Sequence, residues 1–314
     1  MKAPEVVILS GKGGTGKTSV AAAFASLAER PVVVDCDVDA PDLDLVLGAD
    51  VRARGRFTSG WVASISPALC RRCGRCAAEC RFHAVVRLEQ PRGAWRIDDL
   101  FCEGCGACEL ACPSRAISME PADRGEWLRS DTRVGPMLHA RMRPGAENSG
   151  KLVALLRRKG QEIANEMRAG VILCDGPPGI GCPAIATLSG AEHVLFVTEP
   201  SLTGLHDLER AADLAARFRV PGSVFINKSD IDRAQAHGIA RAADERGLTV
   251  IGSAPYDQAF TSAQLAGLSV IEHGDGAAAR SVREAWVRLI ETLASRRARR
   301  PTSLTLRAAE RTTK

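Results

Sequence analysis

The chain has 314 residues, enough for one large domain or two modest ones with a buried core. Hydrophobic residues make up 45% and charged residues 25%, which is ordinary for a globular protein. The net charge of +5 comes from the end of the chain, because residues 296–314 hold seven basic residues and one acidic residue. The remainder is close to neutral, which excludes a basic nucleic-acid-binding body. We expect 296–314 to be a disordered, solvated tail, with a membrane- or nucleic-acid-contacting tail as the alternative.

The first residues run directly into an apolar segment and a glycine loop, without the pattern of a secretory leader. No apolar run approaches the roughly 18 residues that a membrane helix needs, so we expect no stable membrane insertion. These features predict a cytoplasmic protein. In that reducing compartment, eleven cysteines indicate metal binding rather than disulfides.

Apolar runs and alanine-rich helical segments alternate along most of the chain, which predicts an α/β fold with a mostly parallel sheet and helices on both faces. The predicted strands are 5–9, 31–35, 171–174, 193–198, 223–227 and 249–253. The predicted helices are 17–29, 182–190, 203–218, 231–246 and 277–295.

Between Trp61 and Pro121 this alternation stops and cysteines crowd together. An internal repeat of 32 positions accounts for the segment. The repeat relates Cys70, Cys73, Cys76 and Cys80 to Cys102, Cys105, Cys108 and Cys112. We therefore predict a duplicated module at 62–121, inserted into an α/β domain formed by 1–61 and 122–295.

The glycine-rich stretch after the first strand matches the phosphate-binding loop pattern G-x-x-x-x-G-K-[ST], followed at once by a helix. Backbone amides of such a loop surround phosphate oxygens, and the helix N-terminus adds a favourable field. Lys17 is expected to bridge the β- and γ-phosphates, and the Thr18 hydroxyl to bind Mg²⁺. The predicted nucleotide-binding residues of this loop are Gly11, Lys12, Gly13, Gly14, Thr15, Gly16, Lys17, Thr18 and Ser19.

With its additional lysine at position 12, the loop K-G-G-T-G-K-T resembles that of the MinD/ParA superfamily of deviant Walker-A ATPases. The resemblance implies a homodimer that encloses two nucleotides, with Lys12 reaching the phosphates bound by the partner. By the same resemblance, Asp37 activates the attacking water and Asp35 belongs to the Mg²⁺ shell. Asp175 is expected to bind Mg²⁺ through water, and the Gly179 amide to sense the γ-phosphate.

The segment Asn227-Lys228-Ser229-Asp230 follows a predicted strand. The resemblance implies that Asn227 contacts the base of ATP. The N-K-x-D pattern is also the guanine-reading motif of GTPases, with Asp230 accepting from the base, so GTP remains the alternative. A second G-x-x-x-x-G-K match at Gly145–Lys151 lacks the following hydroxyl residue and a preceding strand, and it is interpreted as the cap of a helix.

The second cysteine run, C-x2-C-x2-C-x3-C-P, is that of bacterial ferredoxins, in which the fourth thiolate binds the other of two clusters. The pattern predicts two [4Fe–4S] clusters. The first is held by Cys70, Cys73, Cys76 and Cys112, and the second by Cys102, Cys105, Cys108 and Cys80. The first run departs from the pattern at Arg81, where proline is usual. A four-cysteine zinc site is the alternative.

Arginines crowd the first run and are interpreted as tuning its cluster, docking an acidic electron carrier or forming a solvated face. They are Arg71, Arg72, Arg75, Arg81 and Arg87. Outside the module, Cys36 and Cys174 are expected to be buried thiols. Cys182 begins a predicted helix, and either packs there or holds a cluster between two protomers.

Together these features predict a P-loop ATPase of the MinD/ParA type with an inserted two-cluster ferredoxin domain, which couples Mg-ATP-driven dimer closure to electron transfer. The runner-up is assembly or transfer of an iron–sulfur cluster or metallocofactor. A positioning ATPase and a ligase similar to cobyrinate diamide synthases are the remaining alternatives. The redox or client protein is left open.

Overall fold

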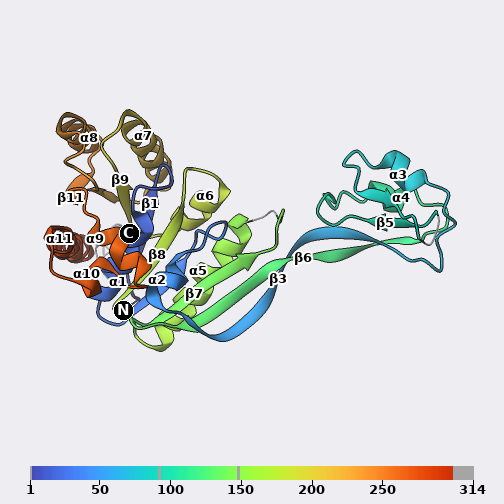
Figure 1. Cartoon of the computed structure of the whole chain (residues 1–314), viewed down its shortest axis with the longest axis horizontal. Coiled ribbons are helices and arrows are strands. Elements are labelled where there is room, and N and C mark those ends of the chain that lie inside the picture. The colour runs from blue at the N-terminus through green and yellow to red at the C-terminus, as the bar shows by residue number, and fades with distance from the viewer. Residues whose placement is uncertain (1, 91–92, 147–148, 300–314) are drawn as a thin grey trace, which may run out of the picture.

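The computed structural model describes residues 2–90, 93–146 and 149–299. Within these ranges a nine-stranded sheet forms the body of the protein (Figure 1). In spatial order its strands are β11 (Thr249–Ser253), β10 (Gly222–Ile226), β9 (His193–Thr198), β1 (Glu5–Ser10), β8 (Val171–Pro178), β2 (Pro31–Asp35), β7 (Pro136–Met142), β6 (Ile117–Asp131) and β3 (Asp50–Ile65). The strands from β11 to β7 are parallel, and β6 and β3 are antiparallel additions at one edge. The predicted α/β class with a mostly parallel sheet is confirmed.

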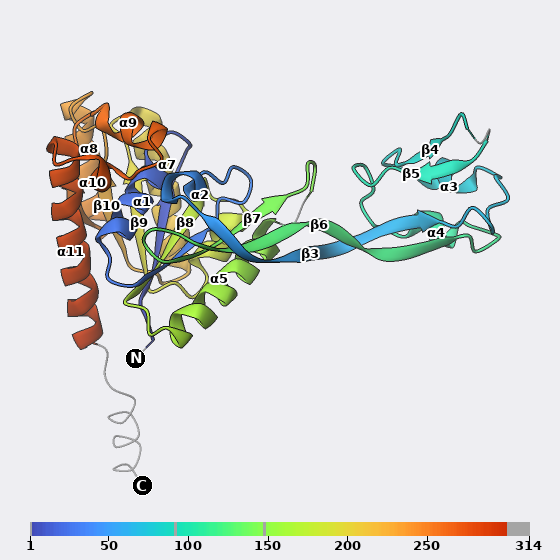
Figure 2. The same ribbon diagram turned by 60° about the horizontal axis from the view of Figure 1, so that its bottom comes forward.

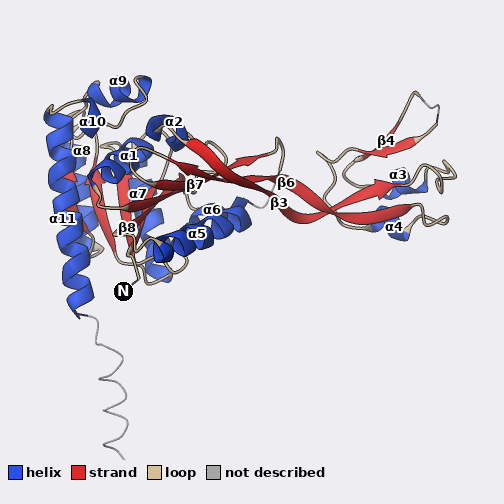
Figure 3. Cartoon of the chain, turned by 90° about the horizontal axis from the view of Figure 1, so that it is seen from below, coloured by secondary structure: helices blue, strands red, loops and turns tan. Residues whose placement is uncertain are grey.

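Helices cover both faces of the sheet (Figure 3). One layer contains α1 (Lys17–Leu27), α2 (Leu43–Leu47), α9 (Ala259–Leu265), α10 (Val270–His273) and α11 (Ala277–Arg299). The other contains α5 (Ser149–Glu166), α6 (Cys182–Leu188), α7 (Leu202–Arg217) and α8 (Arg233–Glu245). Alternate residues of β1 enter different cores: Val6 and Ile8 pack under α1, and Val7 and Leu9 under the opposite layer. Burial on both faces explains why these strands appear as continuous apolar runs.

The antiparallel strands β3 and β6 form a long arm that leaves the body (Figures 1 and 2). They pair from Asp50 opposite Asp131 to Ile65 opposite Ile117. Residues 125–131 of β6 also pair with β7, so the root of the arm is part of the main sheet. Both strands extend across the module boundaries predicted at 62 and 121. The eight cysteines of the repeat lie in the sequence between Ile65, where β3 ends, and Ile117, where β6 begins.

A small module caps the far end of the arm (Figure 1). It contains α3 (Arg75–Glu79), β4 (Val85–Arg87), β5 (Trp95–Ile97) and α4 (Ala107–Leu110). Its core of buried residues within the described ranges is Ala63, Cys76, Val85, Cys108 and Ile117. Two of these five residues are cysteines, so apolar burial alone contributes little to the stability of the module. A group bound by the thiols would add to that stability.

Helix α11 continues to Arg299, which corrects the tail boundary predicted at 296. Arg297 donates to Glu192 through Nε at 2.8 Å and Nη2 at 3.0 Å, fixing this part of the helix to the body. Residues 300–314 of the predicted tail lie outside the described residues. None of the helices in the described ranges combines the length and apolar character needed to cross a bilayer.

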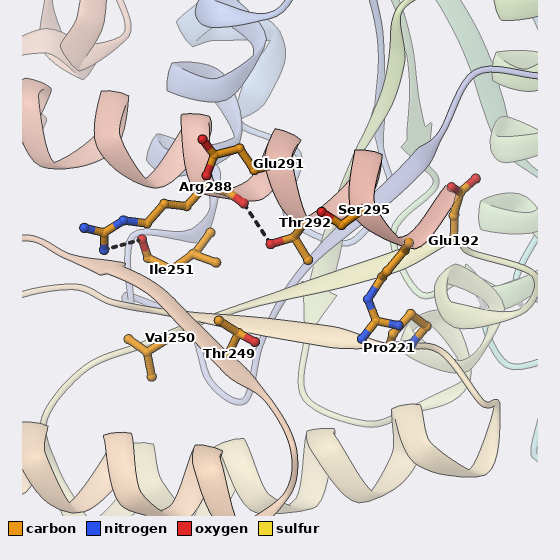
Figure 4. Close-up of a pocket in the computed structure, with 10 residues that line it drawn as sticks. Glu192, Pro221, Thr249, Val250, Ile251, Arg288, Glu291, Thr292 and Ser295 are labelled. Carbon is orange, nitrogen blue, oxygen red and sulfur yellow. Dashed lines mark hydrogen bonds between the residues drawn. The ribbon is translucent and has the colours of Figure 1, made fainter. Parts of the chain in front are cut away.

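A groove of about 780 Å³ lies beside α11, where β11 begins (Figure 4). Arg288 reaches across it and donates to the Ile251 carbonyl at 3.2 Å. Glu192, Pro221 and Thr249 line it where β9, β10 and β11 begin. It therefore lies at the sheet edge opposite the glycine loop and is not part of the site described below.

The buried His193 at the start of β9 predicts a pH dependence of stability. Its Nε2 lies 3.0 Å from Ser223 Oγ, and burial, reinforced by Arg296, lowers the pKa of His193 from 6.5 to about 4. The unfolded chain therefore binds a proton more readily than the folded chain as pH falls below 6.5. We expect the free energy of unfolding to fall by about 3 kcal/mol between pH 6.5 and pH 4 from this group.

Urea denaturation of the wild type and His193→Gln across this range measures the effect. Other groups titrate in both proteins, so the difference between the two profiles isolates His193. Parallel profiles would contradict the assignment.

Candidate functional site

The glycine loop connects the end of β1 to the first turn of α1, at the carboxyl edge of the parallel strands. Gly14 and Gly16 have φ angles of 80° and 90°, which favour glycine. A side chain at Gly16 would overlap Asn227 Nδ2, whereas Cβ atoms at Gly13 and Gly14 would meet nothing within 4 Å. The loop is thus packed at its base and open above Gly13 and Gly14, as a cradle for phosphate oxygens requires.

Two further loop residues contact neighbouring helices. A Cβ atom on Gly11 would overlap Asp207 Cβ, so close packing against α7 requires glycine there. Ser19 Oγ accepts a hydrogen bond from Gln264 Nε2 at 3.0 Å, which ties the first turn of α1 to α9.

Three aspartates gather around Lys17 beside this loop. Neighbouring strands β2 and β8 place Asp35 directly opposite Asp175. Lys17 Nζ lies 2.8 Å from Asp175 Oδ1 and 3.5 Å from Asp37 Oδ2. The Thr18 hydroxyl donates to Asp175 Oδ2 at 2.7 Å. The structure therefore brings together at this point five of the six residues assigned to hydrolysis and Mg²⁺ binding, and the sixth, Lys12, lies apart.

Burial and crowding shift the protonation of this cluster. Burial raises the pKa of Asp35 well above its ordinary value, and the neighbouring Asp175 carboxylate raises it further. Burial also raises the pKa of Asp37, against the opposing charge of Lys17. For Lys17 burial acts to lower the pKa, but the carboxylates, chiefly Asp175, outweigh it and the pKa is raised. Lys17 is therefore the counter-ion that keeps this acidic site together.

The donor set fits Mg²⁺, which prefers hydroxyl, carboxylate and water oxygens. Among the described residues, Asp35 Oδ2 and Thr15 Oγ1 are buried and have no hydrogen-bond partner. Orphaned buried oxygens are costly unless a ligand or water satisfies them. Asp35, Thr18 and Asp175 are the residues that would hold the ion or its water shell.

Lys12 points away from the three aspartates. Its Nζ lies 2.7 Å from Glu199 Oε1 and donates to Thr203 Oγ1 at 3.1 Å, at the start of α7. Glu199 also pairs with Lys228 Nζ at 2.7 Å, and both lysines lower the pKa of Glu199 against the effect of burial. Lys12 is therefore held by its own chain, near the protein surface, and is not engaged with the Lys17 site.

Strand β8 is longer than predicted and ends at Pro178 instead of Cys174. Its extension brings the following Gly179 beside the glycine loop, where the Gly179 amide donates to the Ser10 carbonyl at 2.9 Å. This amide, predicted to sense the γ-phosphate, is thus occupied by the chain itself. Gly179 has a φ angle of 83°, and a Cβ there would meet nothing within 4 Å.

Asn227 and Asp230 both make hydrogen bonds with the backbone. Buried Asn227 donates from Nδ2 to the Thr15 carbonyl at 2.9 Å, so it stabilises the backbone of the glycine loop. Asp230 Oδ1 accepts from the Tyr256 amide at 2.6 Å. Reading of the base by either residue stays a prediction.

The module's cysteines surround two cavities. The first cysteine cavity and the second cysteine cavity each leave about 20 Å³ of space. Cys70, Cys73, Cys76 and Cys112 line the first, and Cys80, Cys102, Cys105 and Cys108 line the second. Each cavity thus takes three thiols from one run and the fourth from the other, which is the exchange expected of a two-cluster ferredoxin.

The four-thiol linings fit [4Fe–4S] clusters, in which each thiolate binds a different iron. Backbone amides approach the sulfurs, with Ala116 N 3.2 Å from Cys112 Sγ and Ala63 N 3.5 Å from Cys102 Sγ. Within the ranges that the structure describes, no group of three or more His, Cys, Asp or Glu converges as a site for one metal ion.

The other three cysteines lie in the body. Cys36 and Cys174 are buried as predicted, and Cys182 is exposed at the first turn of α6. Cys174 is not in apolar surroundings, because its thiol donates to Glu5 Oε1 at 3.4 Å. Glu5 forms a buried ion pair with Arg157.

Sequence reasoning missed Glu199 and the Glu5–Arg157 pair. Glu199 follows β9, the neighbour of β1, and its position after a parallel strand was the available signal for the site. The sequence contains no comparable signal for the Glu5–Arg157 pair, because 152 positions separate its members.

This arrangement of loop, helix and carboxylates at the carboxyl edge of a parallel sheet defines a P-loop nucleotide-binding protein. The CobQ/CobB/MinD/ParA nucleotide binding domain matches residues 6–270, and the chain belongs to that family. An uncharacterised protein of Methanocaldococcus jannaschii is 32% identical over 231 residues, covering 73% of this chain and 79% of that protein.

Solved structures share the fold. The septum site-determining protein MinD from Pyrococcus horikoshii, complexed with Mg-ADP, superposes with a TM-score of 0.56 at 16% identity, covering 90% of this chain and 94% of that one. The ATP complex of a Cyanothece McdA variant gives a TM-score of 0.56 at 15% identity, covering 92% of this chain and 96% of that one.

Proposed function

We propose that this protein is a Mg-ATP-hydrolysing iron–sulfur protein in which nucleotide-driven closure of a homodimer controls electron transfer through two [4Fe–4S] clusters. The observation that carries the proposal is the pair of cysteine cavities at the end of an arm built into a P-loop sheet. Each cavity is lined by four thiols from both cysteine runs.

The nucleotide half rests on the loop and its aspartates. Phosphates occupy the open space above Gly13 and Gly14, and their charge draws Lys17 away from Asp175. The carboxylates of Asp175 and Asp35 and the Thr18 hydroxyl would hold Mg²⁺ and its waters. Asp37, which is more exposed than the other two aspartates, orients the attacking water.

The dimer rests on Lys12. Its present partners are Glu199, in the loop after β9, and Thr203, in the first turn of α7. Lysine–glutamate pairs that solvent reaches are weak. A partner's phosphates therefore outcompete Glu199 for Lys12, which supplies positive charge across the interface when the dimer closes.

The arm connects the nucleotide site in the main sheet to the cysteine module. Asp35 ends β2, β2 pairs with β7, β7 pairs with β6, and β6 runs on to Ile117 in the module core. Hydrogen-bonded strands thus connect the proposed Mg²⁺ site to the module. When bound, the clusters supply one-electron transfer, and the eight cysteines hold them.

A positioning ATPase is the second candidate, favoured by the shared fold with MinD and McdA structures. An ATPase that assembles or transfers clusters is the third, because both cavities are small and near the surface, with Cys73 and Cys105 exposed. Nucleotide dependence of the cluster potentials distinguishes the first proposal from both.

The test is an EPR-monitored redox titration of the full chain after anaerobic reconstitution, with Mg-ATP, with Mg-ADP and without nucleotide. We expect Mg-ATP to change the ratio of reduced to oxidised cluster at a fixed potential by about tenfold in the wild type. Lys12→Ala is expected to remove this response while leaving the clusters in place. Titrations indifferent to nucleotide in both proteins would overturn the gating proposal.

A further inference from the structure

The 32-residue repeat gives the two cysteine cavities equivalent surroundings in most respects. Cys76 and Cys108 are each 8% exposed, and Cys73 and Cys105 are both exposed. The space left in the two cavities, about 20 Å³ each, is also similar. Solvent access and ligand set therefore do not distinguish the two sites.

The charges at repeat-equivalent positions do distinguish them. Arg71 and Arg75 line the first cavity, and the residues 32 positions later, Glu103 and Ala107, line the second. Reduction adds a negative charge to the contents of a cavity. A neighbouring arginine stabilises that charge and a glutamate opposes it.

Hydrogen bonds to the sulfurs differ in the same direction. At the first cavity the Arg72 amide lies 3.4 Å from Cys70 Sγ, the Ala116 amide 3.2 Å from Cys112 Sγ, and Ser114 Oγ 3.6 Å from Cys112 Sγ. At the second cavity the Ala63 amide lies 3.5 Å from Cys102 Sγ. Donors to sulfur spread the negative charge of the reduced state and raise the reduction potential.

We propose that the cluster site of the first cavity has the higher reduction potential of the two, set by Arg71 and Arg75 against Glu103. The inference rests on the two clusters of the proposed function. A single electron given to the module by a low-potential one-electron donor then resides at the first cavity. If it enters at the second, that site is oxidised by one electron as the first is reduced by one.

The experiment is a dithionite titration of the anaerobically reconstituted full chain, followed by EPR, for the wild type and charge variants. We expect two one-electron steps in the wild type. Arg71→Gln combined with Arg75→Gln is expected to lower the higher step, and Glu103→Gln to raise the lower step. Each shift should correspond to about a tenfold change in the ratio of reduced to oxidised cluster, which is about 59 mV for one electron.

Exchange of the charges in R71E/E103R keeps the net charge of the module and is expected to bring the two steps together. Arg158→Gln, on an exposed face of α5, is the matched control and should move neither step. The inference is overturned if the arginine variant moves the lower step, if the arginine and glutamate variants move the same step, or if the exchange changes nothing.

Iron and sulfide analysis of every sample separates this inference from the proposed function. A wild type without bound iron and sulfide overturns the cluster proposal itself. Two bound clusters with the reverse order of potentials overturn the charge inference alone.

Discussion

Lys17→Ala is expected to lower the rate of ATP hydrolysis by about 10²–10³-fold, the cost of removing one preorganised charge from a developing anion. Lys17 is the cation inside the aspartate cluster, with Nζ 2.8 Å from Asp175 and 3.5 Å from Asp37. Without it, the carboxylates face the phosphates directly. Nucleotide binding should weaken as well, and phosphate release with Mg-ATP together with fluorescent-nucleotide titration measures both effects.

The decoy loop provides a matched control. Lys151 ends a second G-x-x-x-x-G-K match, but it lies in the first turn of helix α5, where the preceding Gly150 packs against Cys182 of α6. Lys151→Ala should hydrolyse ATP at the wild-type rate. Both Lys17→Ala and Lys17→Gln leave buried carboxylates without a counter-ion. Circular dichroism of each variant establishes whether it is folded before its activity is compared. Full activity in a folded Lys17 variant would discard the phosphate-site assignment.

The second large effect concerns the module. Cys73→Ser and Cys105→Ser are each expected to remove about half of the bound iron and sulfide, because each thiol lines a different cavity. The double variant should lose the module's fold. The buried cluster of the module has five residues in the described structure, so the free energy of cluster binding takes the place of apolar burial. Iron analysis and limited proteolysis measure these results, with cleavage expected between residues 66 and 116 and an intact body.

Cys182→Ser is the control for this prediction. Its thiol is exposed at the start of α6 and lines neither cysteine cavity, so its iron content should equal that of the wild type. A protein that binds zinc without sulfide would contradict the cluster assignment and favour the zinc alternative. Loss of iron in Cys182→Ser would instead indicate a cluster between protomers.

The sequence predicted the features that depend on neighbours along the chain. The loop from Gly11 to Thr18 is local, because backbone amides and a helix start build it, and its match to a P-loop required no distant residue. The apolar runs of β1, β2, β8, β9 and β10 were recognisable because burial on both faces leaves an uninterrupted hydrophobic segment. The repeat was recognisable because the two cysteine runs have the same spacing, 32 positions apart.

The arm escaped prediction for the opposite reason. At the edge of the main sheet, Arg54 and Arg56 of β3 alternate with small residues. Beyond the main sheet, β3 and β6 form a two-stranded ribbon with much of its surface exposed, so no hydrophobic period appears. The boundaries predicted at 62 and 121 follow the loss of helix and strand periodicity, and the two strands of the arm cross both.

The sequence by itself determined the phosphate-binding loop, the parallel sheet and the repeated cysteine runs, because short-range geometry and burial fix each of them. Only the tertiary structure decided that Asp35 faces Asp175 and that Lys12 is held by Glu199. These contacts join residues far apart in the chain, and they form only when the order of strands brings them together.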